Sequence, residues 1–170
     1  MNGFTALLRA VNVGGTGKLP MTDLKKLCEE LGFGRVRTYI ASGNVVFTSA
    51  KSEAAIKADL ETTLEAYAGK PVGVAVRSAA EIAQVLANNP FPDAPANRTM
   101  AVFLDRPPAA NTLAGVRGQK DEQIVLGRRE IYIHYRDGMA KTKLVVPAAK
   151  TGTARNINTV ATLARMAAEP

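Results

Sequence analysis

The segment NVGGTGKLP, residues 12–20, contains the residue types of a phosphate-binding loop. Glycines next to a lysine are typical of loops that hold phosphate through backbone N–H groups. A P-loop also needs glycine five residues before its Gly-Lys pair and Ser or Thr after it, but Asn12 and Leu19 occupy these positions. The dinucleotide fingerprint needs a third glycine where Pro20 stands. The spacing therefore excludes both motifs.

A simpler anion site remains open for this loop. The backbone N–H groups of Gly14, Gly15 and Gly17, with Lys18 at the start of a predicted helix, form the kind of amide nest that binds anions. The alternative is a strand-to-helix turn whose glycines permit a positive φ. The sequence alone leaves both interpretations open.

Arginine and asparagine side chains elsewhere in the chain could complete such a site. Their planar donor groups suit phosphate, carboxylate or the edge of a base. The alternative is structural: Asn156 or Thr153 caps the last helix, Asn44 serves a turn with positive φ, and Arg9 pairs with a carboxylate. The predicted ligand-binding residues are Arg9, Asn12, Gly14, Gly15, Lys18, Ser42, Asn44, Lys143, Arg155, Asn156 and Asn158.

Catalytic and metal-binding patterns are weak in this sequence. His134 is the single histidine, and it alternates with Ile133 and Tyr135 in a predicted strand, where a structural role is more common than that of a base. No spacing of His, Cys, Asp and Glu resembles a metal site. We therefore predict no catalytic residue, no metal and no cofactor.

Composition limits the class of protein. The chain has 170 residues, 46% of them hydrophobic, and a single cysteine, Cys28, which excludes an intramolecular disulfide. No signal peptide and no apolar run of about 18 residues is visible, so we expect a cytoplasmic protein without a membrane span. The formal net charge is +7, and the charge is unevenly distributed, since residues 98–170 contain 12 basic and 6 acidic residues. This basic end suits nucleic acid or a phosphorylated small molecule as partner, and an ordinary solvated surface is the alternative. The oligomeric state is not indicated.

The first half of the chain alternates strand and helix patterns. The pattern predicts strands over 4–11, 36–42, 44–49 and 72–78, with a hairpin at Gly43. Helices are predicted over 21–31 and between Ser52 and Gly69. The stripe of the second helix comprises Ile56, Leu60, Leu64 and Tyr67. This βαββαβ order predicts a ferredoxin-like plait over residues 1–77.

The second half repeats the pattern less completely. Ser78 and Glu81 form a capping box that opens a linking helix, and a loop completes the linker over 78–97. Residues 98–170 then predict a strand over 99–105, a short helix over 109–116, a hairpin over 122–136 and a helical C-terminus. The predicted fold class is α+β, with two ferredoxin-like (βαββαβ) subdomains. The second is incomplete or modified, because no final strand is visible.

Three blocks of the sequence carry a family resemblance: ALLRAVNVGGTGKLPMTDLKKLCEELGF, TYIASGNVVF and GTARNINTVATLARMA. They resemble the signature blocks of an uncharacterised bacterial family, domain of unknown function 1697. The resemblance implies two ferredoxin-like subdomains and brings no activity with it. The family usually has glycine where this chain has Ala10, asparagine at Gly17 and tryptophan at Ile157. An aromatic stacking role at that last position is therefore not available here.

These features favour binding of an anionic ligand, a nucleic acid or a nucleotide, by the glycine-rich loop and the basic C-terminal half. An enzyme or sensor for a small anionic metabolite in a cleft between the subdomains is the alternative. A protein-interaction scaffold is the third possibility.

Overall fold

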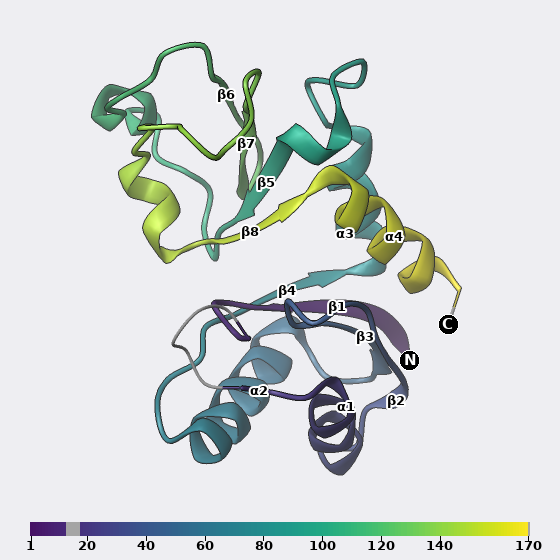
Figure 1. The fold of residues 1–170 in the computed structure, drawn as a ribbon. Helices are drawn as coiled ribbons and strands as arrows, with labels where there is room; N and C mark the ends of the chain where they lie inside the picture. The colour runs from purple at the N-terminus through teal and green to yellow at the C-terminus, as the bar shows by residue number, and fades with distance from the viewer. Residues whose placement is uncertain (13–17, 170) are drawn as a thin grey trace. The chain divides into compact units, whose positions relative to one another are not determined.

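The first sheet of the computed structural model, which describes residues 1–12 and 18–169, has four antiparallel strands (Figure 1). Its elements are β1 (Asn2–Leu8), α1 (Met21–Glu30), β2 (Gly34–Thr38), β3 (Asn44–Ser49), α2 (Glu53–Ala68) and β4 (Val74–Ser78). The strand order is β2-β3-β1-β4, and β1 pairs with both β3 and β4. This arrangement is consistent with the predicted ferredoxin-like plait.

Both helices of this half cover the same face of the sheet (Figure 1). The Ser52 side chain accepts a hydrogen bond from the Ala55 N–H at 3.2 Å and so caps α2, which ends at Gly69 with a φ of 73°. The prediction that Tyr67 belongs to the buried stripe of α2 is wrong, because Tyr67 is 42% exposed. It lies in the last turn, beyond the core, where its hydroxyl donates a hydrogen bond to Asp23 at 2.6 Å.

Cys28 lies on α1 and fills part of the core of the first half. It is fully buried, and this burial raises the pKa of its thiol to about 12. A thiol that stays protonated at neutral pH is a poor nucleophile and a poor metal ligand.

The second sheet is also four-stranded and antiparallel, with the order β6-β7-β5-β8. Its strands are β5 (Thr99–Phe103), β6 (Gln123–Leu126), β7 (Glu130–His134) and β8 (Thr153–Asn156). The prediction that this half lacks a final strand is wrong, since β8 pairs with β5. The sequence hides β8 because it is four residues long and contains a charged residue, Arg155, instead of an apolar run.

The second half differs from the first in its helices. Short 3-10 segments, η2 (Thr112–Gly115) and η3 (Pro147–Thr151), follow β5 and β7 at the places that α1 and α2 hold in the first half. The predicted helix over 109–116 is thus a single 3-10 turn. Another 3-10 turn, η1 (Ala96–Arg98), precedes β5.

Two helices follow the last strands of the two sheets. The predicted capping box opens α3 (Ala79–Ala87), with the Glu81 N–H donating to Ser78 Oγ at 3.1 Å and the Ser78 N–H to the Glu81 carboxylate at 3.0 Å. The other helix, α4 (Ile157–Ala168), begins directly after β8.

The chain divides into two compact units. Unit 1 is Met1–Ala83 with the residues from Thr162 onward, and unit 2 is Gln84–Ala161. The division therefore falls inside α3 and inside α4. The boundaries proposed from sequence, at residues 77 and 97, stay a prediction.

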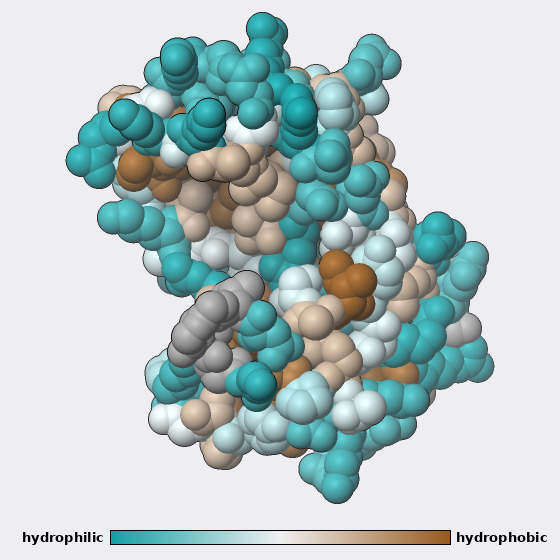
Figure 2. All heavy atoms as spheres, viewed as in Figure 1, coloured by the Kyte–Doolittle hydropathy of each residue, from teal (hydrophilic) through white to brown (hydrophobic). Residues whose placement is uncertain are grey.

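Hydrophilic residues cover most of the surface in the view of Figure 2. Large apolar side chains are exposed at only a few of the described positions: Met1, Ile40, Tyr67, Leu113, Val125 and Met139. Within the described ranges, no helix combines the length and the apolar character that crossing a membrane requires.

Candidate functional site

Arg9 and Asn12 lie just beyond β1, in a connection with unusual backbone angles. The Arg9 N–H donates to the Gly73 carbonyl at 2.9 Å, which holds the end of β1 against the connection between α2 and β4. Ala10 and Asn12 have φ values of 54° and 56°. Glycine adopts such angles without strain, which gives a physical reason for the glycine that the family resemblance places at Ala10.

The Asn12 side chain fixes both ends of the following loop. Its amide nitrogen donates to the Leu19 carbonyl and to the Ala41 carbonyl, each at 2.8 Å, and its amide oxygen accepts the Leu19 N–H at 2.6 Å. Because Leu19 is adjacent to Lys18, these bonds position Lys18. The predicted loop residues Gly14, Gly15 and Gly17 lie outside the described residues.

Arg9 and Lys18 line the same cavity, of about 300 Å³, which we call the unit 1 cavity. Three segments build it: the β1–α1 connection, the C-terminal end of α2 and the connection from α2 to β4. Its lining residues are Arg9, Ala10, Val11, Lys18, Leu19, Leu64, Tyr67, Ala68, Lys70, Pro71 and Val72.

The charges at the unit 1 cavity have one sign. Arg9, Lys18 and Lys70 are all exposed, so their cationic groups lie at its rim. Among the described residues that line it, none is acidic. Lys70 and Tyr67 were missed from the sequence, although Gly69 marks the helix end between them. Their participation depends on where α2 ends relative to β1.

Ser42 and Asn44 form the turn between β2 and β3. The Asn44 amide nitrogen donates to the Tyr39 carbonyl and to Ser42 Oγ, both at 2.9 Å, and Asn44 is fully buried. The positive φ that was assigned to Asn44 belongs instead to Gly43, at 90°. A Cβ at Gly43 would lie 2.6 Å from Val11 Cγ2, so the turn requires glycine.

Arg155 and Asn156 occupy the end of β8, so Arg155 belongs to a strand and lies before the C-terminal helix α4. Burial lowers the pKa of Arg155 to about 10, and its Nη1 donates to the Ala154 carbonyl at 2.9 Å. The Asn156 amide oxygen accepts the Thr159 N–H at 2.9 Å, which identifies Asn156 rather than Thr153 as the cap of α4. Asn158 is exposed in the first turn of α4.

The end of β4 repeats this arrangement in the other half. Arg77 is also buried, its Nη1 donates to the carbonyl of the preceding Val76 at 3.0 Å, and the next residue, Ser78, caps the following helix. The Arg155–Asn156 pair therefore has a structural counterpart in Arg77–Ser78. A ligand contact is not needed to explain the hydrogen bonds that these residues make.

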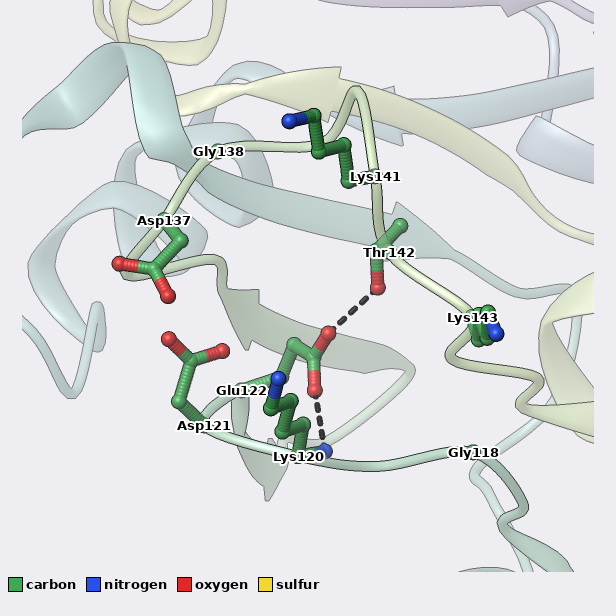
Figure 3. A pocket seen from close by; sticks show the side chains of 9 residues that line it. All are labelled: Gly118, Lys120, Asp121, Glu122, Asp137, Gly138, Lys141, Thr142 and Lys143. Carbon is green, nitrogen blue, oxygen red and sulfur yellow. Dashed lines mark hydrogen bonds between the residues drawn. The ribbon is translucent and has the colours of Figure 1, made fainter.

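Lys143 lines a separate cavity of about 370 Å³, the unit 2 cavity (Figure 3). Two loop segments form its walls, and the backbones of Arg117 and Val145 hold them together through hydrogen bonds of 2.9 and 2.7 Å. A Cβ at Gly118 would lie 2.0 Å from the Lys143 carbonyl oxygen, so the close approach requires glycine. The lining residues are Gly118, Lys120, Asp121, Glu122, Asp137, Gly138, Lys141, Thr142 and Lys143.

Carboxyl groups dominate the interior of the unit 2 cavity. Glu122 accepts hydrogen bonds from the Lys120 N–H at 2.7 Å and from the Thr142 hydroxyl, and these bonds lower its pKa (Figure 3). The carboxyl groups of Asp121 and Asp137 face each other, and the hydrogen bond between them raises the pKa of Asp121. Lysines and acids are equally numerous here, so this cavity has no net preference for an anion.

His134 has a structural environment. It is 6% exposed, its Nδ1 lies 3.2 Å from Thr99 Oγ1, and its ring packs against Phe91 with centroids 5.6 Å apart. Within the described part of the chain, no three side chains of His, Cys, Asp or Glu are grouped so as to hold a metal ion.

Of the predicted ligand-binding residues, the structure brings Arg9 and Lys18 to one cavity and gives Asn12 the part of positioning Lys18. Ser42 and Asn44 serve the β2–β3 turn, and Lys143, Arg155, Asn156 and Asn158 belong to unit 2. Ligand binding by these residues stays a prediction.

Comparison with known proteins gives a family and a similar solved structure, and the description of neither names an activity. A family described as protein of unknown function, DUF1697, matches residues 1–132. A solved structure, that of the conserved bacterial protein SP0830 from Streptococcus pneumoniae, is similar with a TM-score of 0.79 and 25% identity, over 98% of each chain. No curated protein matches.

Proposed function

Because the chain belongs to the DUF1697 family of proteins of unknown function, whose name supplies no activity, we propose a function from the geometry of the site. The protein binds a small anionic ligand in the unit 1 cavity. The observation that carries this proposal is the convergence of Arg9, Lys18 and Lys70 on one cavity that no described acidic side chain lines.

Three like charges around a concave surface raise the local concentration of anions. Lys70 follows the C-terminal end of α2, where a cation interacts favourably with the helix dipole. Arg9 and Lys18 come from a different segment, the connection between β1 and α1, which is not part of α2. A ligand anion accounts for all three cations together.

The size of the unit 1 cavity favours a nucleotide or another phosphorylated small molecule over a polynucleotide. The basic C-terminal half, which the sequence offered as a nucleic-acid surface, contributes Lys143 to a cavity with as many acids as lysines. A track for a polynucleotide needs successive cations along a groove. We propose binding, with no reaction, because the three cations supply attraction and orientation for an anion.

The test is a titration of the isotopically labelled protein with inorganic pyrophosphate, followed by backbone amide NMR. We expect saturable shifts at the residues around Arg9, Lys18 and Lys70. The double variant Lys18→Met/Lys70→Met keeps the aliphatic stems and removes two charges, so the affinity falls about tenfold or more. Lys26→Met, which removes an exposed charge of α1 away from the cavity, is the matched control and leaves the affinity unchanged.

The proposal is wrong if pyrophosphate causes no saturable shifts, or if the double variant binds it as well as the wild-type protein does. A titration with a single-stranded oligonucleotide is a second part of the test. Oligonucleotide binding that the double variant does not weaken would place a nucleic-acid surface elsewhere and would contradict the unit 1 cavity as the anion site.

A further inference from the structure

The unit 1 cavity has an apolar floor beneath its cationic rim. Val11, Leu19, Leu64 and Val72 line it, yet they are only 5%, 4%, 1% and 9% exposed, and all four belong to the core under α1 and α2. Tyr67 and Ala68, which are exposed, form a wall at the end of α2. The cavity is therefore amphipathic, with charge at its mouth and aliphatic groups at its base.

A bare inorganic anion would use only the cationic rim of this arrangement. At about 30 Å³ for each water molecule, the volume of about 300 Å³ corresponds to roughly ten waters. A phosphate ion at the rim would leave most of that space filled by water against apolar side chains. Moving the ion to the floor would instead remove its hydration without supplying donors.

We propose that the natural ligand is an organic anion with an apolar body, a phosphate monoester or a carboxylate that carries an aromatic or aliphatic group. This inference rests on the proposed function and specifies the ligand class of the same site. The anionic head lies among Arg9, Lys18 and Lys70, and the body covers the floor beside Tyr67.

The position of Tyr67 supports an apolar body at this place. Its hydroxyl donates to Asp23 at 2.6 Å, which holds the ring while leaving it 42% exposed. The hydrogen bond to Asp23, together with burial, raises the pKa of Tyr67, so the phenol stays neutral at physiological pH and adds no charge that would repel an anion. A held aromatic ring beside an apolar floor is suited to contact with an organic group.

The experiment compares inorganic phosphate, phenyl phosphate, benzoate and benzyl alcohol as ligands of the full chain by calorimetry and amide NMR. We expect phenyl phosphate to bind at least about tenfold more tightly than inorganic phosphate, as apolar contact in a pocket generally gives. The benzoate arm shows which anionic head the rim prefers. Benzyl alcohol, which has the ring without the charge, binds far more weakly.

Two substitutions separate the floor and wall from the rim. Ala68→Leu adds a good helix former at the last position of α2 and fills part of the cavity, and Tyr67→Ala removes the wall. We expect each of these two variants to bind phenyl phosphate no more tightly than inorganic phosphate. Their affinity for inorganic phosphate should equal that of the wild-type protein. Lys18→Met/Lys70→Met weakens both anions, and Lys26→Met weakens neither.

The outcomes distinguish the two proposals. Equal affinities for inorganic phosphate and phenyl phosphate would contradict the proposal that the ligand has an apolar body, while the proposal of an anion site would stand. An advantage of phenyl phosphate that survives both Ala68→Leu and Tyr67→Ala would also overturn it. If neither anion binds, or if benzyl alcohol binds as tightly as phenyl phosphate, the anion site itself is wrong.

Discussion

Asn12 shows how a residue that looks like a ligand contact can act on the site through another residue. Its amide makes hydrogen bonds to both backbone groups of Leu19 and to the Ala41 carbonyl. These bonds hold the end of the loop at Lys18, which lines the unit 1 cavity. An asparagine in a polar loop can serve either purpose, and only its partners distinguish them.

Asp121 and Asp137 give a prediction at the scale of single residues. The hydrogen bond between their carboxyl groups raises the pKa of Asp121 in the folded protein, so the folded state binds more protons than the unfolded state above the ordinary aspartate pKa of about 3.9. The stability from this pair is complete below that pKa and is lost as the pH rises through the raised value. Asp137→Asn should remove this loss, as urea unfolding across a pH series would show.

Glu122 changes the stability with pH in the opposite direction, because its pKa is lowered in the folded protein. Its stabilising contribution is present above the pKa of the unfolded state and is lost as the pH falls through the folded-state pKa. The informative quantity is therefore the difference between wild type and Asp137→Asn at each pH. Asp93→Asn, in the exposed loop before β5, is the matched control. An identical pH dependence in wild type and Asp137→Asn would show that the pair does not share a proton.

At the scale of elements, the two halves use the same junction between the last strand and the following helix. A buried arginine precedes the capping residue in both, Arg77 before Ser78 and Arg155 before Asn156. Satisfying the first N–H groups of a helix needs a side-chain acceptor at this position. The third signature block therefore has a folding role that the sequence alone could not separate from binding.

Asn156→Ala tests that folding role. Loss of the hydrogen bond to the Thr159 N–H should lower the free energy of unfolding by about 1 kcal/mol, whereas Asn156→Ser keeps an acceptor and most of the stability. Urea unfolding of both variants measures the effect. Wild-type stability in Asn156→Ala would mean that the cap is unimportant and would return Asn156 to the candidates for ligand binding.

At the scale of the whole molecule, the division into units does not follow the order of the chain. The residues from Thr162 onward belong to unit 1, and the part of α3 from Gln84 onward belongs to unit 2. Within unit 1, Arg37 of β2 donates from Nη2 to the Met166 and Glu169 carbonyls at 2.5 and 2.7 Å. Within unit 2, the Tyr132 hydroxyl donates to the Val85 carbonyl at 2.7 Å. Side chains of the sheets thus hold the C-terminal ends of both helices.

Arg37→Met should release the end of α4 from unit 1. The variant keeps an aliphatic stem but loses two hydrogen bonds from a cation, one to the Met166 carbonyl in α4 and one to the Glu169 carbonyl just after it. We therefore expect the free energy of unfolding to fall by about 1–2 kcal/mol and amide exchange near Met166 to become faster. Hydrogen exchange followed by mass spectrometry measures both the loss of stability and the rate of amide exchange near Met166. Lys51→Met, which breaks an exposed ion pair with Asp59, is a control of similar size. Unchanged exchange in α4 would contradict this role of Arg37.

The helices and strands of the first half could be predicted because their signals are local. Apolar spacing, the Ser52 cap and the glycine at the end of α2 each act within a few residues. The strand β8 could not be predicted, since its four residues become a strand only by pairing with β5, about fifty positions earlier in the chain. Tyr67 was misassigned because helical spacing does not show where the core stops.

The sequence by itself determined the α+β class, the order of most elements, the helix caps and the basic character of the chain. Only the tertiary structure decided that Arg9 and Lys18 share a cavity with Lys70, whereas Ser42 and Asn44 serve a turn. The physical reason is distance along the chain. Local backbone preferences and apolar periodicity act between near neighbours, but a binding site forms where packing of the core brings separate segments together.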